Sequence, residues 1–336
     1  MKNKPWQNMT MLEYINSEAR GFFIPDMGTN GLELIGGCTL YDVYQNPLKQ
    51  LELAKKMDEV FDGDFVYTAC DGMVFCEALE MEILKPDDDF PSVLNHPFKT
   101  IEDIEKIKFL DPYKDARMPT NLESIRLLSE NMDKPVYDSV LGPFTLAVQM
   151  AGATHLLGEI IRNPAFVETI LKFTTDLIKR YVLACEKAGA NYIALSEPAA
   201  VTLSPERFAK YVTPNLNTIY KEMKCWKGMH ICGDTTFLLD SILKCNIDAL
   251  SLDQCLDYEK IAPLIPSDIV LIGNLDPVDL VGRGTLQEIE KETKHLKRKM
   301  KNYNNFLCGL GCDCLNDTPV VNLKKVIEIA KSANYD

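Results

Sequence analysis

Short apolar runs alternate with longer amphipathic segments along most of the chain, and this alternation is the feature that most constrains the fold. Helical segments separate most neighbouring runs, a pattern typical of parallel strands joined by helical crossovers. The eight runs that read as strands are 22–25, 64–68, 135–140, 192–196, 228–232, 247–252, 269–273 and 305–308. Eight strands in this order favour a closed barrel over a doubly wound sheet. The sequence therefore predicts an α/β protein with a single (β/α)8 TIM-type barrel that spans residues 1–336 as one domain.

Helix boundaries are marked by capping residues and prolines. Asparagine, serine and threonine before a helix accept hydrogen bonds from its first amides, and proline is tolerated in the first turn. The predicted boundaries are a helix from Asn163-Pro164 to Gly189, one from Ser204-Pro205 that Pro214 kinks, one from a Thr285–Glu288 capping box, and a last one from Thr318-Pro319.

Residues 75–134 fit the barrel pattern least well. This segment is long for one connection and contains the proline- and aspartate-rich run 86–91. We interpret it as an inserted excursion after the second strand, with small helices over 100–108 and 121–131.

Charge and composition exclude several classes of partner. The chain has 36 Lys+Arg against 49 Asp+Glu, a net charge of −13. Such an acidic protein repels phosphate backbones and anionic lipids, so we expect no nucleic-acid or membrane partner. No apolar run reaches the roughly 18 residues of a membrane span. The polar start, 1–13, lacks the apolar stretch of a signal peptide, so we expect a cytoplasmic protein whose 11 cysteines are reduced.

Two potential metal ligands lie on the strand at 228–232. Side chains alternate along a strand, so His230 and Cys232 point to the same face, here the barrel opening, and Gly233 lets the chain turn away. Imidazole and thiolate are ligands that zinc prefers. The alternative is a core histidine beside a small core cysteine.

A third ligand follows the last predicted strand, where Cys312 and Cys314 both offer thiols. Three protein ligands leave a tetrahedral zinc with one open position, which is the arrangement of a catalytic site. Four polar residues follow other strands and are candidate catalytic groups, although each one is equally suited to cap a helix or bind a loop amide: Asp71, Glu197, Asp253 and Asn274. No GxSxG elbow, GxxxxGK[ST] loop or GxGxxG motif is present.

Around these residues the sequence resembles the uroporphyrinogen decarboxylase superfamily, and within it the corrinoid-dependent methyltransferase branch. The resemblance covers nearly the whole chain and implies a (β/α)8 barrel. Its marks are 141–145 (Leu-Gly-Pro-Phe-Thr), 188–190 (Ala-Gly-Ala), 203–208 (Leu-Ser-Pro-Glu-Arg-Phe), 230–233 (His-Ile-Cys-Gly), 273–277 (Gly-Asn-Leu-Asp-Pro), and Gly311-Cys312 followed by Thr318-Pro319 and Asn322.

The resemblance to methylcobamide:coenzyme M methyltransferases implies a ligand set and two partners. It assigns zinc to His230, Cys232 and Cys312. Cys314 is then expected off the metal during turnover, where it either lines the pocket or holds zinc only when substrate is absent. It further implies a corrinoid, carried by a separate protein that docks over the barrel opening, and a small-molecule thiol as methyl acceptor. The residues that the resemblance assigns to the cofactor are Gly142, Pro143, Thr145 and Gly273.

Three other functions remain open on the sequence. The same fold serves as a donor-side methyltransferase that demethylates a methyl ether or methylamine onto cobalt(I). The decarboxylase itself resembles a pattern with an N-terminal arginine-rich segment, whereas residues 20–27 here contain one arginine. A non-catalytic corrinoid-binding protein would need none of the three ligands. Residues 313–317 also depart from the apolar segment usual after the Gly-Cys pair, so the pocket and substrate are expected to differ.

Overall fold

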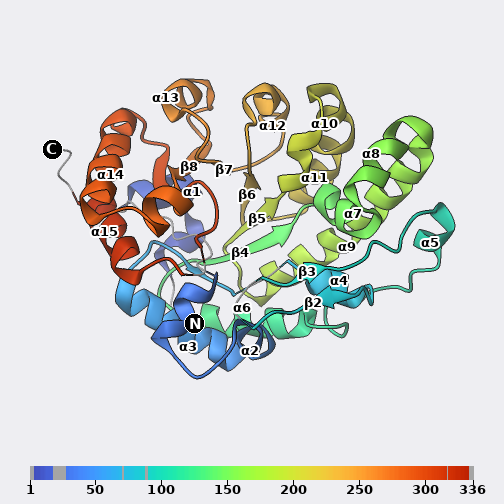
Figure 1. Cartoon of the computed structure of the whole chain (residues 1–336), viewed down its shortest axis with the longest axis horizontal. Coiled ribbons are helices and arrows are strands. Elements are labelled where there is room, and N and C mark those ends of the chain that lie inside the picture. The colour runs from blue at the N-terminus through green and yellow to red at the C-terminus, as the bar shows by residue number, and fades with distance from the viewer. Residues whose placement is uncertain (1–3, 18–27, 70–71, 88–89, 316, 333–336) are drawn as a thin grey trace.

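A single curled parallel sheet forms the centre of the protein. The computed structural model describes residues 4–17, 28–69, 72–87, 90–315 and 317–332. Within these ranges the sheet has seven strands in the order β1-β4-β5-β6-β7-β8-β9, each parallel to the next (Figure 1). They are β1 (Val66–Tyr67), β4 (Val136–Leu141), β5 (Tyr192–Ser196), β6 (Trp226–Ile231), β7 (Ala249–Leu252), β8 (Val270–Leu275) and β9 (Phe306–Leu310).

Seven of the eight predicted strands are thereby confirmed, with boundaries within two residues of those expected. The remaining run, 22–25, lies outside the described residues. The α/β class and the parallel, curled sheet are therefore established, while closure by an eighth strand stays a prediction.

Helices form an arc around the outside of the sheet (Figure 1). Among the described residues no single helix is long and apolar enough to cross a membrane. Only the bent pair α7 (Pro143–Ala151) and α8 (Ala153–Arg162), which turns by 103° at its break, has the necessary length and apolarity when taken together. The helices are α1 (Met11–Asn16), α2 (Leu40–Gln45), α3 (Pro47–Phe61), α4 (Val74–Ala78), α5 (Ile101–Glu105), α6 (Met118–Asn131), α7 (Pro143–Ala151), α8 (Ala153–Arg162), α9 (Pro164–Ala188), α10 (Pro205–Tyr211), α11 (Thr213–Tyr220), α12 (Leu239–Ile242), α13 (Tyr258–Ile261), α14 (Leu286–Met300) and α15 (Val320–Lys331).

The predicted helix boundaries are confirmed by the capping contacts. Asn163 accepts a hydrogen bond from the Phe166 amide at the start of α9, and Gly189, with φ of 120°, ends that helix. Ser204 caps α10, and the chain breaks between α10 and α11 just before Pro214. The capping box of α14 is present, and α15 follows Pro319 directly.

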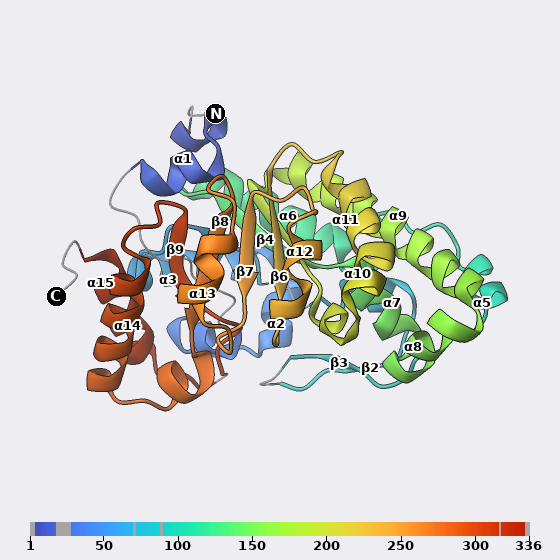
Figure 2. The same cartoon turned by 90° about the horizontal axis from the view of Figure 1, so that it is seen from above.

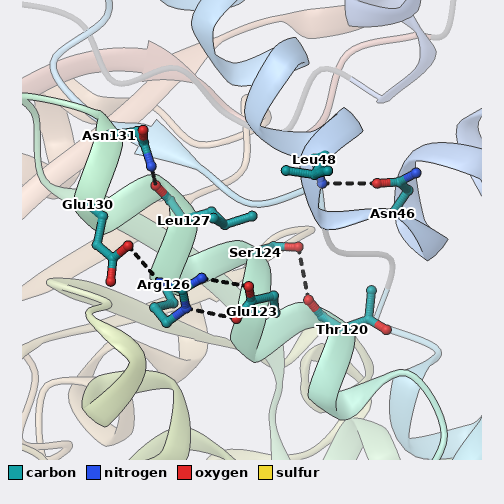
Figure 3. Close-up of polar contacts among 9 residues, drawn as sticks. All are labelled: Asn46, Leu48, Thr120, Glu123, Ser124, Arg126, Leu127, Glu130 and Asn131. Carbon is teal, nitrogen blue, oxygen red and sulfur yellow. Dashed lines mark hydrogen bonds and ion pairs between the residues drawn. The ribbon is translucent and has the colours of Figure 1, made fainter.

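Between β1 and β4 the chain forms α4, an antiparallel hairpin of β2 (Ile83–Leu84) and β3 (Ser92–Val93), and then α5 and α6. The two predicted small helices correspond to α5 and α6, the second beginning three residues earlier than expected. On the surface of α6, Arg126 pairs with Glu123 and Glu130 (Figure 3). Exposed pairs of this kind contribute little each. The helix is held mainly by its buried face, which includes Ile125 and Leu128.

The concave side of the sheet is filled at the amino-terminal ends of the strands. A core cluster there includes Trp226 and Tyr192, and α1 packs onto it (Figure 2). The Tyr14 hydroxyl donates a hydrogen bond to the Asp64 carbonyl, and the Trp226 indole donates one to the Met9 carbonyl. In folds of parallel strands and helices the functional site lies at the carboxyl-terminal ends of the strands, which are opposite this core.

Candidate metal centre

Strand β6 and the residue that follows it present two candidate metal ligands, His230 and Cys232, on the concave side of the sheet. Trp226 faces the concave core, so the alternation of side chains places His230, four residues later, on the same side. Cys232 follows the strand end, and Gly233 turns the chain away with φ of 85°. His230 Nε2 lies 2.9 Å from Cys232 Sγ.

The segment after β9 brings in a third candidate ligand, Cys312. Cys312 Sγ lies 3.1 Å from Cys232 Sγ. The ligand atoms of His230, Cys232 and Cys312 all lie within 4.8 Å of one another, and the three residues are half-buried. One imidazole nitrogen and two sulfurs form a donor set suited to zinc, and their convergence fits that ion.

Cys314 lies elsewhere. Its side chain is 4% exposed and belongs to the core cluster between sheet and helices. Within the part of the chain that the structure describes, it is not among the residues that converge as metal ligands. The candidate centre therefore offers three protein ligands, and an open fourth position for a substrate stays a prediction.

The two thiols differ in their tendency to ionise. A hydrogen bond from the Cys232 thiol lowers the pKa of Cys312 to about 4, with help from His230 and against the effect of burial. The same hydrogen bond, together with burial, raises the pKa of Cys232. Of the two thiols, Cys312 is therefore the one whose ionisation the surroundings favour.

Ser251 on β7 is a site residue that the sequence analysis missed. It lies opposite His230 in the parallel register of β6 and β7, and its Oγ is 3.0 Å from His230 Nδ1. A histidine that binds metal through Nε2 carries its proton on Nδ1, and Ser251 is placed to accept it. Because serine occurs in every kind of structural context, its residue type alone does not indicate this role. The pairing of Ser251 with His230 in neighbouring strands is the observation that does.

We expect Ser251→Ala to weaken zinc binding by about 10-fold to 100-fold, because it removes the hydrogen bond that orients the His230 ring. Competition with a chelating dye measures this affinity. Ser196→Ala is the matched control: Ser196 lies opposite His230 on β5, and its side chain makes no hydrogen bond within the described ranges. Equal zinc affinity in Ser251→Ala and the wild type would remove Ser251 from the site.

Asp253 and Asn274, two of the predicted catalytic residues, lie beside this centre and bind backbone groups. The Asp253 carboxylate accepts hydrogen bonds from the amides of Gly233 and Cys255, at 2.8 and 2.9 Å. Burial acts to raise the pKa of Asp253, but these two amides, the Cys255 thiol and the charge of His230 together outweigh it and hold the pKa below its usual value. The Asn274 side chain donates to the carbonyls of Asp253 and Leu256. Direct contact of either side chain with a substrate stays a prediction.

Glu197 is fully buried and receives three hydrogen bonds at the start of α7. The donors are the amides of Phe144 and Thr145, at 2.9 and 2.7 Å, and the Thr145 hydroxyl, at 2.7 Å. Burial raises the pKa of Glu197 to about 7, although the three donors act to lower it. The carboxylate therefore binds a helix start, one of the two alternatives that the sequence left open.

Of the residues predicted to bind a cofactor, three lie beside Glu197 and the fourth lies beside Tyr258. Gly142, Pro143 and Thr145 are buried, and a Cβ on Gly142 would come within 2.3 Å of the Glu197 carboxyl carbon. Gly273, with φ of 138°, packs against the Tyr258 hydroxyl in the same way. Their contact with a corrinoid stays a prediction. Asp71, the fourth predicted catalytic residue, lies outside the described residues.

Fold and site together define an α/β protein with a curled parallel sheet and a His-Cys-Cys cluster that could hold a metal ion at the carboxyl-terminal ends of its strands. Residues 26–333 match the family model described as uroporphyrinogen decarboxylase (URO-D). The chain belongs to the URO-D family.

Its relatives include methyltransferases. A methylcobamide:CoM methyltransferase, MtbA, from Methanosarcina acetivorans is 32% identical over 252 residues, which are 73% of this chain and 72% of that protein. A methylated-thiol–coenzyme M methyltransferase from Methanosarcina mazei is 27% identical over 76% of this chain and 70% of its own length. A solved methyltransferase structure from Methanosarcina mazei shares the fold, with a TM-score of 0.85, 22% identity, and coverage of 95% and 96% of the two chains.

Proposed function

We propose that this protein is a zinc-dependent methyltransferase that moves a methyl group from a corrinoid protein to a small-molecule thiol. The observation that carries the proposal is the convergence of one imidazole nitrogen and two cysteine sulfurs within 4.8 Å of one another. The similarity to a methylcobamide:CoM methyltransferase supports the reaction class. The uroporphyrinogen decarboxylase reaction gives no role to this donor set.

Three residues of the chain would bind the metal, and a fourth would position one of them. His230, Cys232 and Cys312 would hold zinc and leave one position for the substrate sulfur. Zinc bound there lowers the pKa of a substrate thiol, so that a thiolate is available at neutral pH. Ser251 orients the imidazole, while the half-buried position of the ligands keeps the centre accessible from one side.

The same arrangement supports a place for the corrinoid partner. The amino-terminal ends of the strands are covered by α1, whereas the metal ligands lie at the opposite ends. A partner that delivers a methyl group to a substrate at the centre must approach from the carboxyl-terminal side. We propose that the corrinoid protein docks at these ends, where its corrinoid would supply the methyl group.

X-ray absorption at the zinc edge tests the acceptor. Addition of a thiol substrate is expected to add one sulfur neighbour at about 2.3 Å, the ordinary zinc–thiolate distance. In parallel, methylcobalamin should lose its methyl group to the same thiol and not to an alcohol of the same size. Both measurements use the zinc-loaded wild-type protein and a panel of small thiols.

Two results would contradict the thiol acceptor. If no thiol changes the spectrum while a methyl ether or methylamine loses its methyl group to cobalt(I) corrinoid, the enzyme works in the donor direction. If the purified protein binds no zinc and decarboxylates uroporphyrinogen, the methyltransferase proposal fails as a whole.

A further inference from the structure

One turn of the chain lies between the segment that carries Cys232 and the segment that carries Cys312. The turn comprises residues 253–256, directly after β7, and the Leu256 amide closes it by donating to the Asp253 carbonyl. On one side the Asp253 carboxylate accepts the amide hydrogen bond of Gly233, the residue that follows Cys232. The turn is therefore bonded to the chain one residue from a ligand of β6.

On its other side the turn presses against the segment that carries Cys312. A Cβ added to Gly311 would come within 2.3 Å of the Gln254 amide nitrogen and 2.8 Å of its Cα. Only glycine allows such a close approach of two backbones. The turn thus contacts the residue after one cysteine ligand and the residue before the other.

The turn is itself fixed from β8. The Asn274 side-chain amide donates to the carbonyls of Asp253 and Leu256, at 3.2 and 2.7 Å, and so holds both ends of the turn. The second Asp253 oxygen accepts the Cys255 amide within the turn. Both carboxylate oxygens are occupied, and the residue is 9% exposed.

We propose that the turn 253–256 is a clamp that sets the separation of Cys232 and Cys312, and that Asp253 is its positioning residue. This inference rests on the metal centre of the proposed function, but not on the reaction that the centre performs. It gives Asp253 a role through backbone contacts, one that does not require the direct contact with a substrate that a catalytic group makes.

Zinc affinity of Asp253→Ala tests the clamp, with Asp276→Ala as the matched control. Asp276 accepts two backbone amides, from Val278 and Asp279, just after the next strand of the sheet. Each variant therefore loses a carboxylate that accepts two backbone amides at the end of a strand. Of the two carboxylates, only that of Asp253 bonds to the residue next to Cys232. Competition with a chelating dye gives the affinity, and the visible spectrum of the Co²⁺-loaded protein reports the ligand geometry.

Asp253→Ala is expected to weaken zinc binding by about 10-fold to 100-fold, as for other groups that orient metal ligands, and to alter the Co²⁺ spectrum. Asp276→Ala is expected to leave both unchanged. Should Asp253→Ala fail to fold, Asp253→Asn keeps one acceptor oxygen and should show a smaller loss of affinity.

Three results would overturn the clamp. Wild-type zinc affinity in the folded Asp253 variants would leave the carboxylate without a positioning role. Equal weakening by Asp276→Ala would show a general loss of loop order. A wild-type protein without zinc would remove the proposed metal centre, and the clamp with it.

Discussion

Replacing Cys312 by serine is expected to strip zinc from the protein and abolish its activity, whereas Cys314→Ser keeps the metal and most of the activity. The Cys312 sulfur lies 3.1 Å from the Cys232 sulfur. The Cys314 side chain is only 4% exposed and packs in the core cluster between the sheet and the helices. His230→Ala and Cys232→Ala should lose zinc in the same way. Metal analysis per chain, with the melting temperature as a check on folding, measures all four variants.

The ligand variants should remain folded because these side chains are half-buried at the ends of strands and not packed in the core. The reverse pattern, with zinc lost only from Cys314→Ser, would mean that the third ligand is placed wrongly. Equal and complete loss in both cysteine variants would point to four protein ligands. Such a site is structural, and the open position for a substrate would have to be abandoned.

Glu197→Ala is expected to destabilise the protein by about 3 kcal/mol or more, because a buried donor left without an acceptor costs roughly 1–3 kcal/mol. The change removes the acceptor of two amides and one hydroxyl at the start of α7. Urea unfolding gives the loss. Thr202→Ala is a suitable control, since its exposed hydroxyl donates one hydrogen bond to the Ala199 carbonyl within its own turn.

Glu197 should also make the stability depend on pH. Burial raises its pKa to about 7 in the folded protein, and a glutamate in an unfolded chain titrates near 4.3. Between these values the folded state holds a proton that the unfolded state has lost, so the free energy of unfolding falls as the pH rises. The expected fall, between about pH 4.3 and 7, is on the order of 4 kcal/mol.

Comparison with Glu197→Gln isolates this contribution, because glutamine does not titrate. Unfolding curves at several pH values should show a steeper fall for the wild type than for the variant. Asp138, also buried and with its pKa raised to about 6 by burial, titrates in both proteins and cancels in the difference. Parallel curves for the two proteins would show that Glu197 is ionised throughout.

Several elements of the fold were predictable because their causes are local. The start of α9 depends on Asn163 and Pro164, and the start of α14 on Thr285 and Glu288, all within one turn of the helix they begin. The strand boundaries followed from the length of each apolar run. The helix α6 begins three residues earlier than predicted, at Met118, because its first turn packs Met118 into the core, a contact that no local pattern shows.

The sequence by itself determined the α/β alternation, the helix caps and the shared face of His230 and Cys232, because each depends on spacing along one segment. Tertiary structure decided what depends on distances between strands. It placed Cys312, and not Cys314, beside Cys232, and it set Ser251 opposite His230 through the register of β6 and β7. It also directed the Glu197 and Asp253 carboxylates onto backbone amides of other segments. A side chain's type limits which partners it accepts, but only the folded chain selects among partners that are far apart in sequence.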